Sequence, residues 1–163
     1  MIASRGSVVP LFLSQIREGG PVTITLQEMT RFLLSLDQAV DTIFTAVRTG
    51  LPGETYVPKV PSARVVDIAE VLINGRDIPR VHIGIRPGEK VHEILVSEEE
   101  RYRTIERDGH YVILPTLPEL RRMAAEPPAL KGEYSSEHVT INPDALRVLL
   151  APYVHAELER MPA

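Results

Sequence analysis

The chain has 163 residues, of which 44% are hydrophobic and 25% charged, and its formal net charge is -4 at pH 7. This composition is typical of a soluble globular protein, and the length suits one domain rather than two. Acidic and basic residues are interspersed without a basic block, which argues against a general nucleic-acid binder. Apolar runs are too short to span a bilayer, so no membrane segment is expected.

Several signatures of particular protein classes are missing from the sequence. Cysteine is absent, which excludes a disulfide framework and a thiolate metal site. The first residues do not follow the charged and then apolar layout of a signal peptide, so we expect a cytoplasmic location. Neither the Gly-x-Gly-x-x-Gly turn of a dinucleotide-binding fold nor the phosphate loop of nucleotide hydrolases occurs, and the histidines lack metal-ligand spacing. We therefore expect this chain to bind no cofactor and no metal by itself.

Helices and short strands are predicted to alternate through the first half of the chain. The helices follow from apolar residues at helical spacing, and the strands from clusters of β-branched residues. The helix that begins near Asp37 carries Val40, Ile43, Phe44 and Val47 at this spacing. In chain order we expect a helix over 7–17, a strand over 22–25, a helix over 37–50, a strand over 54–57, a helix over 65–73 and a strand over 81–85.

A hairpin and a long surface excursion are predicted next. Strands over 104–106 and 111–114 flank Asp108 and Gly109, a pair that readily adopts the positive φ of a tight turn. Residues 115–136 are rich in proline, charge and small side chains, which is typical of a segment on the surface.

Two helices, over 143–150 and 152–161, are predicted to close the chain. No internal repeat and no low-complexity tract interrupts the pattern. The sequence therefore predicts a single α/β domain over residues 1–163, in which short strands alternate with helices.

One candidate binding segment leads into the first predicted helix. It contains Ser4, Arg5, Ser7, Val9 and Pro10. Free backbone N–H groups at a helix start, together with an arginine, suit a phosphate group. An ordinary capping segment is the competing interpretation, which the residues alone favour.

Two further candidates are arginines in unusual surroundings. Arg31 lies in an otherwise apolar stretch that ends at Leu36, so it either extends to the surface or points into a polar cleft. Arg86 and Glu89 flank the Pro-Gly turn at 87–88, which places them on the same side of a loop. A guanidinium there suits a phosphate, and a carboxylate suits a pair of sugar hydroxyls. A solvated charged turn is the competing interpretation of this loop.

Taken in order, six segments resemble one known family, the nucleotide-sugar 4,6-dehydratases and related epimerases of bacterial surface-polysaccharide and flagellin-sugar biosynthesis. The resemblance extends from about Ser4 to Leu149. The segments are Ser-Arg-Gly-Ser-Val-Val-Pro-Leu-Phe at 4–12, Gly-Gly-Pro-Val-Thr-Ile-Thr at 19–25, Met-Thr-Arg-Phe-Leu-Leu-Ser-Leu at 29–36, Val-Pro-Lys at 57–59, Gly-Ile-Arg-Pro-Gly-Glu-Lys-Val-His-Glu at 84–93 and Gly-Glu-Tyr-Ser-Ser at 132–136.

This family consists of extended short-chain dehydrogenase/reductases, in which an N-terminal Rossmann domain holds NAD(P) and a smaller C-terminal domain holds the UDP-sugar. The resemblance implies that this chain is the C-terminal substrate-binding portion, without a complete Rossmann sheet. It implies that Arg31 and Arg86 contact the diphosphate of the UDP-sugar and that Glu89 holds the ribose hydroxyls.

The same resemblance implies roles for the segment before the first helix. Ser4, Arg5 and Ser7 would lie at the sugar-facing edge of the cleft, and Val9 and Pro10 would lie near the uracil. Lys59 matches a family position to which we assign no role.

The family's glycine fingerprint, its Thr/Asp/Lys dehydratase cluster and its Tyr-x-x-x-Lys pair all lie upstream of the region that this chain matches. We therefore expect a UDP-sugar-binding fragment that is catalytically silent alone. Two alternatives stay open: an interaction module that self-associates, and one half of a split enzyme that needs a separate Rossmann-domain chain. In the family, the strand over 54–57 completes the Rossmann sheet and the helix from Asp37 packs against it. A truncated gene, a misread start and a natural split all fit this pattern.

Overall fold

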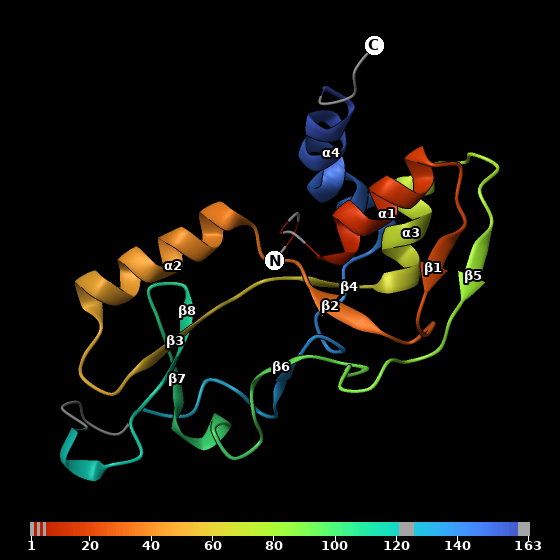
Figure 1. The fold of residues 1–163 in the computed structure, drawn as a ribbon. Coiled ribbons are helices and arrows are strands. Elements are labelled where there is room, and N and C mark those ends of the chain that lie inside the picture. Colours follow the sequence, from red (N-terminus) through yellow and green to blue (C-terminus); the bar gives the residue numbers. More distant parts are fainter. Residues whose placement is uncertain (1, 3, 5, 121–125, 160–163) are drawn as a thin grey trace.

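The computed structural model describes residues 2, 4, 6–120 and 126–159, with side chains up to residue 154. Helices and short strands alternate along the chain (Figure 1), and no sheet among these residues has more than three strands. The predicted α/β class, with short strands and without a complete Rossmann sheet, is confirmed.

The helices form largely where apolar periodicity predicts them. Ser35 begins the second one with a reciprocal capping box, in which its side chain accepts from the amide of Gln38 and the Gln38 side chain accepts from the amide of Ser35. The helices are α1 (Val8–Arg17), α2 (Leu36–Thr49), α3 (Val65–Ile73) and α4 (Pro143–Glu159), with 3₁₀ turns η1 (Arg101–Arg103) and η2 (Pro118–Leu120).

The strands are short and form four small sheets. β1 pairs in parallel with β5, β2 pairs antiparallel with β4, β8 lies between β3 and β7, and β6 pairs antiparallel with β9. The strands are β1 (Val22–Ile24), β2 (Thr30–Phe32), β3 (Thr55–Pro58), β4 (Ser62–Arg64), β5 (Arg80–His82), β6 (Ile94–Val96), β7 (Thr104–Arg107), β8 (His110–Ile113) and β9 (Tyr134–Ser135).

The hairpin prediction is confirmed in detail. Arg107 pairs with His110, so that Asp108 and Gly109 form a two-residue loop. Both loop residues have positive φ, 49° and 73°. This conformation matches the twist of the two strands and is accessible to an Asp-Gly pair.

The closing region differs from the sequence prediction. One helix, α4, replaces the two predicted helices, although Pro152 lies inside it. Proline removes a single hydrogen-bond donor from a helix, and the helix is anchored by the fully buried Leu146 and Leu150 on the preceding turns. The segment 115–136 is exposed over 116–119 and 126–129, whereas its last three residues are buried.

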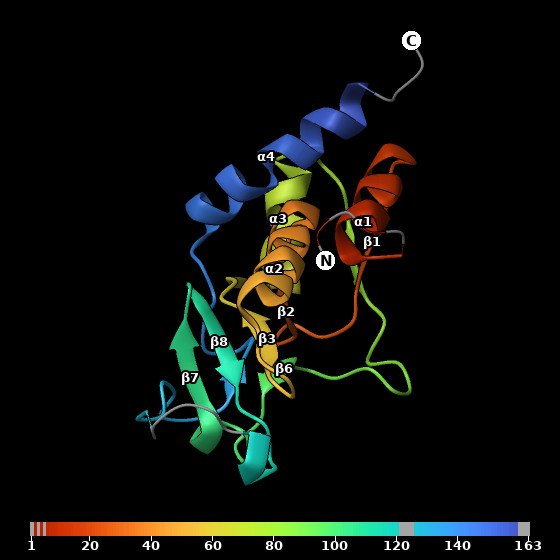
Figure 2. The ribbon, with the colours of Figure 1, turned by 90° about the vertical axis from the view of Figure 1, so that its left-hand side faces the viewer.

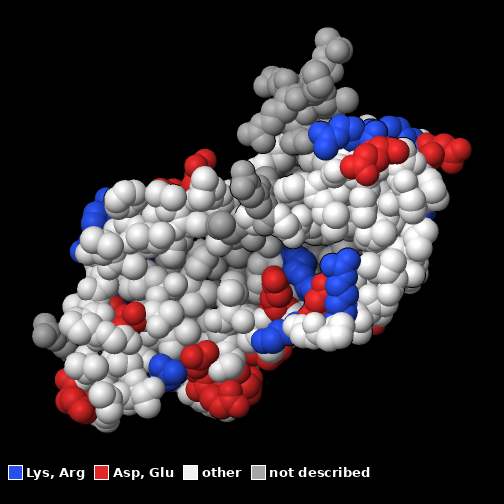
Figure 3. Space-filling model, in the orientation of Figure 1, with Lys and Arg blue, Asp and Glu red and all other residues white. Residues whose placement is uncertain are grey.

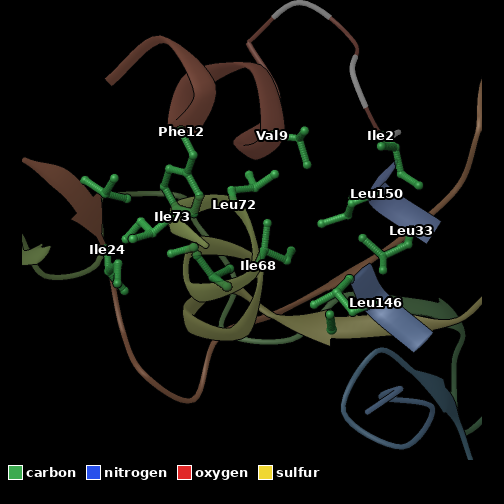
Figure 4. Packing of buried hydrophobic residues seen from close by; sticks show 14 of the residues in the cluster. Ile2, Val9, Phe12, Ile24, Leu33, Ile68, Leu72, Ile73, Leu146 and Leu150 are labelled. Carbon is green, nitrogen blue, oxygen red and sulfur yellow. The ribbon is translucent and has the colours of Figure 1, made fainter. Parts of the chain in front are cut away.

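The larger apolar core lies where α1, α3 and α4 pack together (Figure 4). Val9 and Phe12 of α1 point toward Ile68 of α3, and Leu146 contributes from α4. Burying these side chains in contact with one another is the main stabilising contribution to this half of the molecule.

A second, smaller core joins the hairpin sheet to the centre of the chain. Phe32 and Tyr134 stack with ring centroids 5.1 Å apart, and Tyr111 meets Tyr134 edge-on at 5.0 Å. Val60 is held by the Tyr134 hydroxyl, which accepts from its amide at 2.9 Å and donates to its carbonyl at 2.8 Å. The segment 29–33, which contains β2, therefore borders both cores, because Met29 and Leu33 pack in the larger one and Phe32 in the smaller.

Helix α2 stands apart from the other helices, above the sheet of β3, β8 and β7 (Figures 1 and 2). None of its residues is buried. Its apolar side chains Leu36, Ile43, Phe44 and Val47 are between 61% and 76% exposed. This face lacks a covering partner among the described residues.

Candidate functional site

A cavity of about 270 Å³ opens between the start of α1, strand β2 and the segment 83–93. In Figure 3 basic and acidic side chains gather in a hollow beneath α1. The charged residues that line the cavity are Arg31, Arg86, Glu89 and Glu93.

The start of α1 presents hydrogen-bond donors to this cavity. Ser7 is the N-cap residue, but its side chain caps no backbone amide, and its buried Oγ has no hydrogen-bond partner among the described residues. The amides of Val8 and Val9 precede the first helical hydrogen bond, from Leu11 to Ser7. No acidic side chain lies in the first turn of α1. The positive end of the helix dipole is therefore not neutralised by the helix itself.

Arg31, from β2, also lines the cavity and is held by backbone carbonyls. Its Nη1 donates to the carbonyl of Thr30 at 2.7 Å and to that of Val91 at 3.3 Å. Its side chain is 22% exposed. The sequence left two interpretations open, and the guanidinium lies in the wall of a polar cleft rather than extending freely into solvent.

Arg86 and Glu89 lie on the same side of their loop, as the Pro-Gly turn predicts. The Glu89 carboxylate accepts from the amide of Arg86 at 3.2 Å, and the Glu89 amide donates to the Arg86 carbonyl at 3.1 Å. These two bonds close the turn, and the other carboxylate oxygen of Glu89 accepts no hydrogen bond from the residues that the structure describes. The Arg86 guanidinium makes no ion pair with any residue that the structure describes.

Glu93 is a cavity residue that the sequence analysis did not propose. One of its oxygens accepts from the amide of Phe32 at 3.0 Å, and the other lies 3.9 Å from Nε of Arg31. The carboxylate therefore orients the arginine while it neutralises only part of its charge. Glu93 ends the charged motif at 84–93, and this position was the available sequence signal.

Thr23 and Thr25 were also missed. They line the cavity, while Val22 and Ile24, which alternate with them, are fully buried. This is the two-residue alternation of a strand, and it could have been used to place the threonines on the cavity face.

Five of the eight predicted site residues line one cavity. Ser4 and Pro10 are partly buried near the start of α1 but are outside the lining, and Arg5 lies outside the described residues. The five residues in the lining are Ser7, Val9, Arg31, Arg86 and Glu89.

The chemistry of the cavity suits an anionic, hydroxyl-bearing ligand more than a metal. Guanidinium groups and free helix-start amides bind phosphate, and a carboxylate accepts from hydroxyls. In the part of the chain that the structure describes, no three acidic or histidine side chains converge as metal ligands. No helix there is both long and apolar enough to cross a bilayer.

Comparison with known proteins identifies the family. Residues 1–115 match the family model described as "Polysaccharide biosynthesis protein". Because this match covers more than half of the sequence, the chain belongs to that family, as the six sequence segments indicated.

Two of three similar proteins are named for reactions of UDP-sugars. The chain is 38% identical over 118 residues to a UDP-N-acetylglucosamine 4,6-dehydratase (inverting) of Campylobacter jejuni, covering 72% of this chain and 35% of that one. It is 42% identical over 115 residues to a UDP-glucose 4-epimerase of Rickettsia akari, covering 69% and 34%. A Methanocaldococcus jannaschii protein named as an uncharacterized membrane protein is 40% identical over 124 residues, covering 71% and 37%.

A solved structure extends the comparison to the fold. The X-ray structure of Pen from Bacillus thuringiensis matches with a TM-score of 0.81 and 32% identity, covering 93% of this chain and 47% of that one. The chain thus spans roughly a third of the length of these curated relatives and about half of the Pen chain.

Proposed function

We propose that the cavity binds the nucleoside diphosphate part of a UDP-sugar. The observation that carries this proposal is the convergence of Arg31, Arg86 and the uncapped start of α1 on one cavity. Donors from several elements around one cavity suit a diphosphate, which has several charged oxygens to share among them. Two of the relatives are named for reactions of UDP-sugars, which supports uridine as the nucleoside.

Within this proposal each side chain contacts a different part of the ligand. Arg31 and Arg86 bind the diphosphate, Glu89 accepts from the ribose hydroxyls, and Val9 borders the uracil. Ser7, whose buried hydroxyl is unpartnered among the described residues, donates to the ligand and so regains a hydrogen bond.

The dehydratase or epimerase chemistry of the relatives would need a nicotinamide cofactor in addition. The sequence has no Gly-x-Gly-x-x-Gly turn, so its residues do not fit a dinucleotide of the Rossmann type. The proposal is that this chain supplies substrate binding and is catalytically silent alone. Hydride and proton transfer then belong to the part of the relatives that this chain does not match.

Calorimetric titration of the purified chain tests the binding proposal. UDP and UDP-N-acetylglucosamine should bind, UMP should bind more weakly because it lacks the second phosphate, and uridine should bind weakest. Equal affinity for UDP and uridine would show that the arginines do not hold the diphosphate and would refute the proposal.

A second function is supported by the exposed face of α2. Its apolar side chains lie above β3, an edge strand that pairs on one side only among the strands that the structure describes. An apolar helix face beside an open sheet edge suits a partner that adds a strand and covers the helix. The relatives are about three times as long as the matched region. We therefore propose that the occupant is the Rossmann portion of a family-length protein, in the same polypeptide or in a separate chain.

Mixing the chain with a separately produced Rossmann portion from a close relative tests this interface. Light scattering should detect a one-to-one complex that Phe44→Asp on α2 disrupts. Val148→Asp is the matched control, because Val148 is equally apolar, is 76% exposed and lies on α4, away from α2. A homodimer formed through α2 that persists in the mixture would show that a second copy is the occupant, contrary to the proposal.

A further inference from the structure

A chain of buried hydroxyl groups lies directly behind the cavity. Thr30 Oγ1 is 2.6 Å from Ser136 Oγ and 2.8 Å from Nδ1 of His92. Thr30 is 3% exposed and Ser136 is fully buried. Residues 30, 92 and 136 come from three distant parts of the sequence, so the contact is a product of the tertiary fold.

Ser136 connects this chain of hydroxyls to Glu93. The Glu93 amide donates to Ser136 Oγ at 2.9 Å, and the Ser136 amide donates back to the Glu93 carbonyl at 2.8 Å. The Ser62 hydroxyl donates to the Ser136 carbonyl, which fixes the serine to β4. Ser136 therefore forms hydrogen bonds through its side chain, its amide and its carbonyl.

All hydrogens in the chain of hydroxyls find acceptors when His92 is neutral and carries its proton on Nε2. The Glu93 amide then donates to Ser136 Oγ, Ser136 to Thr30 Oγ1, and Thr30 to Nδ1 of His92. Complete pairing matters here, because a buried hydroxyl without a partner is destabilising. Removing one hydroxyl breaks two of these bonds.

The segment that the hydroxyls hold is the one that orients Arg31. The Val91 carbonyl accepts from both the Thr30 amide and the Arg31 guanidinium, and a carboxylate oxygen of Glu93 lies 3.9 Å from Nε of Arg31. A shift of residues 91–93 therefore moves two of the groups that fix the guanidinium in the cavity wall, and leaves the Thr30 carbonyl as its remaining backbone acceptor.

We propose that Thr30 and Ser136 are positioning residues for the diphosphate site: their buried hydroxyls lock residues 91–93 against β2 and so hold Arg31 toward the ligand. This inference rests on the proposed UDP-sugar binding. It assigns a role in binding to a serine that lies 105 residues from Arg31 in the sequence (136 − 31) and outside the cavity lining.

Four variants test the inference, with UDP and UMP as probes in calorimetry. Thr30→Val removes the hydroxyl at nearly constant volume, Thr30→Ser keeps it, and Ser136→Ala removes the second hydroxyl without adding atoms. Thr104→Val is the matched control, because Thr104 is also fully buried and its hydroxyl donates to the Glu100 carbonyl, away from the cavity.

Thr30→Val and Ser136→Ala should each weaken UDP binding by roughly fivefold, the equivalent of about one net hydrogen bond. UMP binding should weaken less, because the loss falls on the diphosphate contact. Thr30→Ser and Thr104→Val should bind UDP within about twofold of the wild type, although Thr104→Val should also lower thermal stability. Ser136→Ala keeps the test valid if Thr30→Val does not fold.

Two outcomes separate this inference from the function on which it rests. If the wild type fails to bind UDP, the proposed function is wrong and the inference fails with it. If the wild type binds UDP and both hydroxyl deletions bind it equally well while folded, the proposed function stands. In that case the hydroxyls have a purely structural role and the inference is wrong.

Discussion

Replacing Arg86 with alanine tests the contribution of a cavity charge to ligand binding with little effect on the stability of the fold. The guanidinium is exposed and pairs with no described residue, so its loss should change the free energy of unfolding by less than about 0.5 kcal/mol. Arg31→Ala would be harder to interpret, because Arg31 also donates to the backbone carbonyls of Thr30 and Val91.

The expected loss in binding follows from the type of contact. A hydrogen bond between a guanidinium and a phosphate is charge-assisted, and its removal costs about 1.5–3 kcal/mol. This corresponds to a UDP affinity that is weaker by roughly 10- to 150-fold. The loss should shrink as salt is added, because the site is open to solvent on the Arg86 side.

Calorimetry with UDP at two salt concentrations measures this effect, and thermal unfolding checks that the variant is folded. Arg48→Ala is the matched control, since Arg48 is an exposed arginine of α2 outside the cavity lining and its replacement changes the net charge equally. Unchanged UDP affinity in Arg86→Ala, or an equal loss in Arg48→Ala, would refute the reasoning.

Three further predictions concern stability, its pH dependence and cofactor binding. Tyr134→Phe should lower the free energy of unfolding by about 1–3 kcal/mol, because it leaves the amide and carbonyl of Val60 without their buried partner. A free energy of unfolding equal to that of the wild type, measured by chemical denaturation, would contradict this. Burial raises the pKa of the Tyr134 phenol above its ordinary value, so the folded state favours the neutral phenol. The contribution of Tyr134 to the free energy of unfolding should be complete below about pH 10 and should be lost as the pH rises further. Tyr134→Phe should not show this loss. NADP should show no micromolar binding in calorimetry, since the sequence has no glycine turn for the pyrophosphate, and a measured micromolar affinity would overturn that expectation.

The helices could be predicted from sequence because each carries enough residues for the apolar period to emerge. The third helix has the predicted bounds, Val65–Ile73. The strands β2, β4, β6 and β9 were missed, because two or three residues are too few to show alternation. β1 is equally short but was predicted, because its three residues, Val22, Thr23 and Ile24, are all β-branched. The single helix α4 was misread as two because proline usually ends a helix, whereas here tertiary packing of Leu146 and Leu150 maintains it.

The residues of the candidate site could be predicted where a charged side chain occurs in an unusual sequence context. Arg31 in an apolar stretch, and Arg86 with Glu89 on a tight turn, all line the cavity. The contribution of Ser136 could not be read from sequence, because its link to Thr30 depends on a contact between distant segments. The same limit applies to Ser7: its place at the start of the first helix was predicted, but its lack of a capping bond depends on local geometry.

The central claim is tested most directly by a crystal structure of the chain grown with UDP-N-acetylglucosamine. The account predicts the diphosphate in the cavity beneath α1, with its oxygens in contact with Arg31 and Arg86 and the ribose hydroxyls at Glu89. A UDP-sugar bound elsewhere, for instance in the polar pocket beside Arg64 and Arg80, would contradict the account.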